Sequence, residues 1–136
     1  MFTLFFEPRH RVMLTRYSVV LSSEDLETVD AFVAVFVARE GYVRSIYDLT
    51  DVKAFAIPRS KLLERGRKLR MNPGQDRVFV VPQPEIHELY REYAQTQLDL
   101  GNGELMTVHT LPEALHLLGL YNPDFQRLMV ASSPRG

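Results

Sequence analysis

His87 and Glu88 begin like the zinc-binding motif H-E-x-x-H, which places two histidines on one face of a helix. Arg91 occupies the position of the second histidine, so the motif is incomplete. The chain has no cysteine, which excludes thiol nucleophiles and cysteine-based zinc sites. The other three histidines fall in separate predicted elements. They are His10, His109 and His116. We therefore predict no metal site.

Motifs for phosphate binding and acyl transfer are also missing from the sequence. It contains neither a G-x-G-x-x-G nor a G-x-x-x-x-G-K-[ST] loop, whose backbone N–H groups would hold phosphates. No serine lies in a G-x-S-x-G turn, the setting of the hydrolase nucleophile. We predict no cofactor and no catalytic residue.

Asp48 and Asp51 are the carboxylates best placed for chemistry, because they lie near the end of a predicted strand, where α/β folds place their sites. General acid–base catalysis would need a partner group, and the sequence fixes no histidine or lysine beside them. The favoured interpretation is that both are turn or capping carboxylates and that the protein is not an enzyme. An acid–base pair is the alternative.

Charge is segregated along the chain, although the formal net charge is only −1. Residues 59–70 carry six basic side chains and one acid, a net of +5, whereas residues 84–104 carry five acids and one arginine, a net of −4. A solvated helix face is the simplest interpretation of the basic stretch; a docking face for an acidic partner or an anion is the alternative. Nucleic acid is disfavoured, because aromatic residues that would stack on bases are not interleaved with the cations.

The basic stretch begins at a predicted helix start. Proline is tolerated at the first helical position, so Pro58 there makes Ile57 the N-cap. Ile57 has no side-chain oxygen, which leaves the N–H groups of Arg59 and Ser60 facing the loop Thr50–Ile57, as in an anion site at a helix N-terminus. Capping by water or by Ser60 is the simpler alternative. The candidate docking or anion-binding residues are Thr50, Asp51, Ile57, Pro58, Arg59, Ser60, Arg65 and Lys68.

The 136 residues, 46% of them hydrophobic, suit one compact domain. The apolar N-terminus is interrupted by Glu7 and Pro8 and has neither the basic leader nor the cleavage site of a signal peptide. No apolar run approaches the roughly 20 residues of a membrane helix. Since the absence of cysteine fits a reducing compartment, we predict a cytoplasmic protein without an integral membrane segment.

Hydrophobic periodicity predicts five strands and four helices. The predicted strands are Met1–Glu7, Arg11–Tyr17, Val43–Leu49, Arg77–Val81 and Leu105–Thr110. The predicted helices are residues 22–40, Pro58–Leu69, Glu85–Leu98 and Leu111–Leu118. In the first helix, Leu26, Val29, Val33 and Phe36 recur at spacings of three and four and mark the buried stripe.

The element order β-β-α-β-α-β-α-β-α predicts an α/β fold for residues 1–120. Helices between successive strands imply right-handed crossovers, which build a parallel sheet. The short turn at residues 8–10 makes the first two strands an antiparallel hairpin. We therefore predict a single mixed, mostly parallel sheet with an N-terminal hairpin and about four helices.

Residues 121–136 are predicted to form a C-terminal extension. Asn122-Pro123 would start one more helical turn carrying Phe125, Leu128 and Met129, ahead of a frayed end. The N-terminal strand is predicted to be a sheet edge, and edges must be covered or paired. We therefore predict that the chain pairs with a second copy in a homodimer, and that the tail residues Phe125, Leu128 and Met129 cover the neighbouring copy.

The stretch Tyr47-Asp48-Leu49-Thr50-Asp51-Val52 resembles the D-L-[ST]-x-V strand end of STAS domains, the fold of anti-sigma-factor antagonists. Residues 21–25, 77–82 and 110–118, reading LSSED, RVFVVP and TLPEALHLL, are similar to short stand-alone bacterial STAS-like proteins. Those proteins are related in fold to CRAL-TRIO lipid-binding domains. The resemblance covers residues 1–120 and implies a regulatory or protein-interaction module.

The sequence departs from the family at the phosphorylation site. In phospho-regulated antagonists, an Asp-Ser-Ser-Gly run follows the strand end, and its first serine is phosphorylated. Here the equivalent stretch is Ala56-Ile57-Pro58-Arg59, and Ile57, at or beside the acceptor position, has no hydroxyl. Ser60 lies about one turn further into the helix and is a poor substitute. We therefore carry over no phosphorylated residue.

Two functions follow from the resemblance. The first is a non-enzymatic STAS-like regulatory module that binds another protein, or a second copy of itself, through the stretch from Thr50 to Arg70. The alternative is a small carrier of a lipid or other apolar ligand. The CRAL-TRIO relationship and a set of apolar residues favour it. The set is Phe2, Leu4, Phe5, Phe6 and Phe55.

Overall fold

The computed structural model describes residues 1–67, 75–103 and 105–131. The strands in this part of the chain are β1 (Phe2–Glu7), β2 (Val12–Leu21), β3 (Arg44–Phe55), β4 (Arg77–Val80), β5 (Leu105–Val108) and β6 (Gln126–Ala131). The helices are α1 (Ser23–Glu40), α2 (Arg59–Gly66), α3 (Pro84–Asp99) and α4 (Leu111–Leu117). None of these helices is long and apolar enough to cross a membrane.

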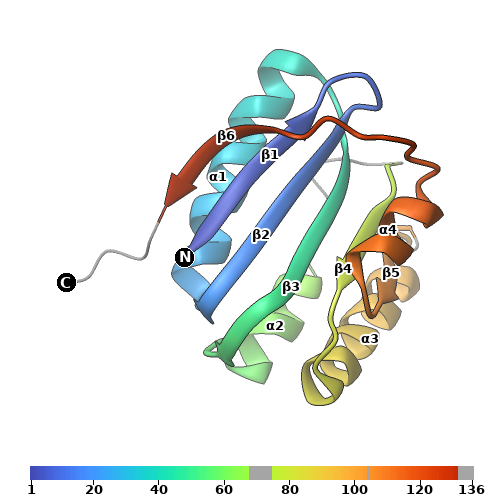
Figure 1. Ribbon diagram of the computed structural model, residues 1–136. Coiled ribbons are helices and arrows are strands. Elements are labelled where there is room, and N and C mark those ends of the chain that lie inside the picture. Colours follow the sequence, from blue (N-terminus) through green and yellow to red (C-terminus); the bar gives the residue numbers. More distant parts are fainter. Residues whose placement is uncertain (68–74, 104, 132–136) are drawn as a thin grey trace.

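The described strands form one six-stranded mixed sheet in the order β5-β4-β3-β2-β1-β6 (Figure 1). Strands β2 to β5 run parallel to one another, and β1 is antiparallel to both of its neighbours, β2 and β6. Parallel neighbours need crossover connections, which α1, α2 and α3 provide. The predicted α/β fold, with a mixed, mostly parallel sheet, an N-terminal hairpin and four helices, is confirmed.

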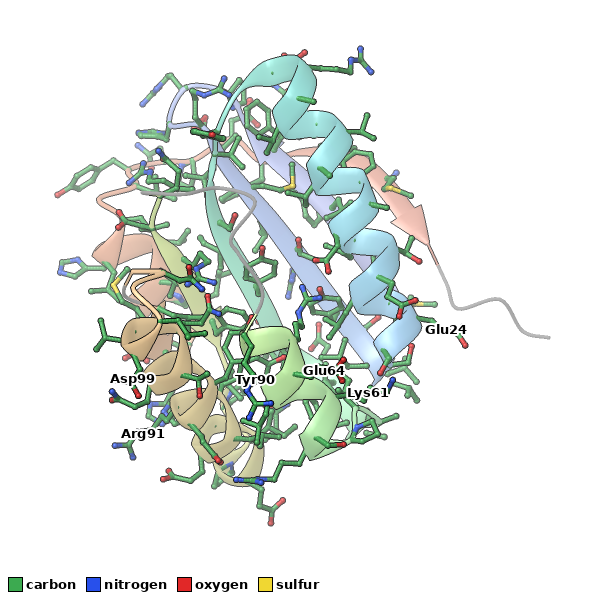
Figure 2. All side chains as sticks on the ribbon, turned by 180° about the vertical axis from the view of Figure 1, so that it is seen from behind. Glu24, Lys61, Glu64, Tyr90, Arg91 and Asp99 are labelled. Atoms are coloured by element: carbon green, nitrogen blue, oxygen red, sulfur yellow. The ribbon has the colours of Figure 1, made fainter. Side chains whose placement is uncertain are left out.

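Two hydrophobic clusters cover opposite faces of the sheet. Figure 2, the view from behind, shows α1, α2 and α3 in front of one face, and Figure 1 shows α4 on the other. Side-chain alternation along a strand divides the residues between the two clusters: in β2, Met13 belongs to the first cluster, while Val12 and Leu14 belong to the second. In α1, Leu26 and Val29 are buried in the first cluster, as their spacing indicated.

Helix α1 begins with a capping box. The Ser22 hydroxyl accepts a hydrogen bond from the Asp25 N–H at 3.2 Å, and the Asp25 carboxylate accepts one from the Ser22 N–H at 3.3 Å. Two N–H groups that would otherwise lack partners are satisfied, an arrangement worth about 1 kcal/mol. The helix ends at Gly41, whose φ of 93° is accessible to glycine without strain.

The structure corrects the prediction for the C-terminal extension. The described residues after Asn122, 123–131, form no helical turn; they include β6, which pairs with β1. Their pattern suits a strand, since Met129 packs into the first cluster whereas Leu128 and Val130 are exposed. Because β6 covers β1, the prediction that β1 is a sheet edge is also wrong. Residues 132–136, predicted to fray, lie outside the described residues.

The structure also corrects the predicted loop Thr50–Ile57, because β3 continues to Phe55. This part of β3 pairs with the end of β2 through two register shifts. The shifts break the period of two, so that Leu49, Val52 and Phe55 face the same cluster at spacings of three. A pattern search based on strict alternation ends the strand too early for this reason.

Candidate functional site

Helix α2 begins one residue later than predicted. The ψ of Pro58 is 142°, which is not helical, so Pro58 is the N-cap and Arg59 is the first helical residue. The prediction that Ile57 is the N-cap is therefore wrong. The Ile57 side chain is only 5% exposed and belongs to the first hydrophobic cluster. The position that resembles the phospho-acceptor is thus occupied by an apolar side chain inside the core.

The first turn of α2 faces outward. Pro58, Arg59, Ser60 and Lys61 are all exposed. The Arg59 guanidinium donates a hydrogen bond to Glu92 of α3, and these side chains remain 62% and 43% exposed. Exposed ion pairs are worth about 0–1 kcal/mol. Arg59 can therefore exchange Glu92 for another anion at little cost.

Arg65 lies on the inner side of the same helix. Its guanidinium donates to both carboxylate oxygens of Asp30 on α1, and the two side chains are 27% and 32% exposed. Burial lowers the pKa of Arg65, but the hydrogen bonds and the charge of Asp30 outweigh that effect and raise it. Arg65 thus ties α2 to α1. Lys68, the other cation predicted for docking, lies outside the described residues.

An aromatic cluster lies beneath α2. The ring of Phe79 on β4 stacks on Tyr47 of β3 at 4.7 Å between centroids and lies 4.6 Å from Tyr90 of α3. Gly66 lets α2 approach α3 closely, because a Cβ there would lie 3.3 Å from the Tyr93 ring. Burial raises the pKa values of Tyr47 and Tyr90. The inner side of α2 is therefore part of the packed core.

Thr50 and Asp51 belong to a polar group with Asp48 and Arg16. Asp48 is buried, and its Oδ1 accepts hydrogen bonds from the Thr50 hydroxyl and from the Thr50 N–H, the latter at 2.9 Å. Arg16 Nε lies 3.2 Å from Asp48 Oδ2, and Arg16 Nη2 lies 3.5 Å from Asp51 Oδ2. Both carboxylates are thus paired with a cation, and Asp48 also accepts local hydrogen bonds. Because both lie within β3, the interpretation as turn or capping carboxylates is wrong.

Two residues of this region were missed at the sequence level. Arg16 could have been found from strand alternation. It shares a face with Leu14, and Asp48 shares a face with Ile46; because Leu14 pairs with Ile46 in the neighbouring strand, Arg16 pairs with Asp48. Gln83 carries no such signal. Its Nε2 donates to the carbonyls of Leu49 and Val52 at 2.8 Å and 3.1 Å, beyond the point where β4 pairs with β3.

Two of the four histidines, predicted in separate elements, meet in space. The rings of His87 and His109 are stacked, with centroids 4.3 Å apart. His87 Nδ1 lies 3.0 Å from the Val81 carbonyl oxygen, so this nitrogen carries the proton. Among the described residues, no group of three or more histidine, aspartate or glutamate side chains is arranged to hold a metal ion.

The structure divides the candidate residues instead of gathering them. Pro58, Arg59 and Ser60 are exposed at the start of α2. Thr50 and Asp51 lie in the polar group with Arg16. Ile57 lies in the core, and Arg65 lies at its margin. The surface around Arg59 therefore remains open to a partner, and Thr50 and Asp51, on the strand that leads to it, are exposed as well.

No family model matches the sequence, and no curated protein matches it. The structure is similar to that of the anti-sigma factor antagonist SpoIIAA in its unphosphorylated form. The TM-score is 0.58, the sequence identity is 17%, and the match covers 90% of this chain and 100% of that chain. The resemblance drawn from Asp48–Val52 is thereby confirmed at the level of the fold. The protein has a STAS-like fold.

Proposed function

We propose that the protein is a non-enzymatic regulatory module that docks another protein at the outer side of the β3–α2 junction, in the cytoplasm. The observation that carries the proposal is the contrast within one short stretch. Ile57 is 5% exposed, whereas Pro58, Arg59 and Ser60, which follow it directly, are exposed. A partner can reach this surface, but a kinase finds no hydroxyl at position 57.

The charges of this surface favour a partner with acidic side chains. Lys53, Arg59 and Lys61 are exposed around the junction, and opposite charge steers and orients a protein partner. We leave Arg65 out of the proposed surface, because Asp30 already occupies its guanidinium. Of the basic stretch 59–70, the proposed surface thus includes only the first turn of α2.

Affinity capture from the native host tests the proposal, with the wild-type chain and two charge reversals as baits. Arg59→Glu changes the proposed surface. Arg91→Glu is the matched control, because Arg91 is 64% exposed and pairs with Glu88 on the outer side of α3 (Figure 2). We expect one partner to be captured by the wild type and by Arg91→Glu but lost with Arg59→Glu. Equal capture by all three baits, or capture of chaperones alone, contradicts the proposal.

A carrier of small apolar ligands is the second candidate, and a groove favours it. The groove measures about 570 Å³ and lies between α3 and β5. Its lining combines Ala94, Leu98 and Leu105 with the polar residues Glu88, Arg91, Glu92, Gln95 and Thr107. Its size falls in the range of small-molecule sites. Native mass spectrometry of the protein from its host, with thermal unfolding in the presence of lipids, tests this function. An empty chain whose melting temperature no lipid raises excludes it.

A further inference from the structure

The end of β2 contains a residue in an unfavourable backbone conformation. Val19 has a φ of 65°, in the left-handed region, where glycine and asparagine are common and a β-branched residue is an outlier. The register of β2 against β3 shifts directly after it, between Val19 and Val20. The chain is therefore less stable with valine at this position than with a residue that accepts this conformation.

The Val19 side chain does not join the core. Strict alternation along β2 would place it on the face of Tyr17 and Leu21, which are both buried in the first cluster. Val19 is instead 53% exposed, and Val20 beside it is 39% exposed. Two adjacent apolar side chains thus lie at the surface, and packing in the core does not account for the strained valine.

These two valines border the proposed docking surface. In the register of β2 against β3, Val19 pairs with Val52 and Val20 pairs with Ala54. Lys53, which belongs to the proposed surface, lies between these two partners on β3 and is exposed. Figures 1 and 2 show the ends of β2 and β3 beside α2, whose first turn carries the other cations of that surface. An apolar pair thus adjoins the cations that a partner would meet.

The charges around the two valines are unevenly distributed. Lys53, Arg59 and Lys61 are exposed on β3 and α2, whereas Glu24 and Glu27 are exposed on α1, which follows β2 directly. Figure 2 shows Glu24 and Lys61 on these two helices. Opposite charge orients a protein partner, so the acidic residues of a partner seated on the valines would lie toward α2 and away from α1.

We infer that Val19 and Val20 form the apolar centre of the docking surface, and that the partner presents an apolar side chain flanked by acidic residues. Strained backbone is typical of functional sites, and β-bulges there redirect side chains. An apolar centre beside charged residues is also the usual composition of a protein interface. The inference rests on the proposed function, to which it adds the residues that give affinity and the chemistry of the partner.

The substitution Val19→Asn separates a role in binding from a role in stability. Asparagine accepts a positive φ, so we expect the melting temperature of the full chain to rise by about 3 °C. In the capture experiment, this bait should retain about tenfold less of the partner than the wild type, because the apolar contact is lost. Val130→Asn is the matched control, since Val130 is 54% exposed in β6 without a positive φ. Its melting temperature should not rise, and its capture should equal that of the wild type.

Carbodiimide coupling of the captured complex tests the charge of the partner, because the reagent joins a lysine amine directly to a carboxylate. We expect mass spectrometry to find Lys53 or Lys61 joined to an aspartate or glutamate of the partner. If Arg59→Glu loses the partner but Val19→Asn retains it, the inference is overturned while the docking surface stands. A Val19→Asn chain that does not melt above the wild type, or a partner that couples at neither lysine, also overturns the inference. A wild type that captures no partner overturns the docking surface and the inference together.

Discussion

The two sides of α2 hold cations in opposite situations. On the inner side, Arg65 is paired with both oxygens of Asp30 and is 27% exposed; on the outer side, Arg59 pairs with Glu92 and is 62% exposed. Both arginines belong to the same basic stretch of the sequence. Residues from other helices therefore decide whether a cation joins two helices or stays accessible to a partner. The charge of its own stretch does not decide this.

The largest loss of stability is expected from a substitution of Ile57, in the core beside α2. Ile57→Ser restores a hydroxyl near the family's acceptor position, but it leaves a cavity and buries a polar group. We expect the free energy of unfolding to fall by about 3–4 kcal/mol, measured by urea denaturation. Ser60→Ala, three residues along the same junction, should change it by less than about 0.5 kcal/mol. If Ile57→Ser is as stable as the wild type, Ile57 does not belong to the core.

A smaller loss is expected at the pair of Arg65 and Asp30. Arg65→Ala leaves the carboxylate of Asp30 half-buried without its cation, which should cost about 2–3 kcal/mol, less than for a fully buried pair because water screens part of it. The double variant Asp30→Ala with Arg65→Ala should lose less than the sum of the single variants. Additive losses in denaturation would mean that the two side chains do not interact.

Alkaline pH probes the buried tyrosines of the first hydrophobic cluster. Burial raises the pKa values of Tyr17, Tyr47 and Tyr90 from the ordinary value of 10.0. Below pH 10 these groups are protonated in both the folded and the unfolded state and contribute no pH dependence. Above pH 10 the unfolded chain loses protons first, so the free energy of unfolding should fall as pH rises. Tyrosinate absorbance and urea midpoints, recorded together, check this. Tyrosines that titrate normally while the chain stays folded contradict it.

The smallest effect on stability is expected on the outer side. Arg59→Ala should change the free energy of unfolding by less than about 1 kcal/mol, because its pair with Glu92 is exposed. High salt should reduce this difference further, since exposed pairs are screened. A loss comparable to that of Arg65→Ala would remove the distinction between the two sides of α2. Thermal and urea unfolding at low and high salt measure it.

The fold was predictable where local signals agreed with one another. The Ser22–Asp25 capping box and the stripe beginning at Leu26 and Val29 fix α1 from neighbouring residues alone. The misses depend on distant partners. Gln126–Ala131 becomes a strand because β1 lies beside it, and the register shifts that lengthen β3 depend on β2. Local patterns do not contain that information.

The position of the candidate site was predictable from the sequence, but only some of the residues that form it were. The family-like strand end and the following helix start led to the junction, and the missing hydroxyl at Ile57 was visible directly. The pairing of Arg65 with Asp30 was not, because it joins residues 35 positions apart on two helices. Asp30 lies on α1, so the charges of residues 59–70 alone do not show that Arg65 is already paired.

Site-specific photo-crosslinking in the native host tests the central claim most directly. A photoreactive residue at Ser60 reports on the outer side of α2, and one at Glu88, 72% exposed on α3, is the control. We predict that one protein is crosslinked from position 60, that none is crosslinked from position 88, and that Arg59→Glu abolishes the crosslink while the chain keeps its melting temperature. No crosslinked protein at position 60, or the same protein from both positions, would contradict a docking surface at the β3–α2 junction.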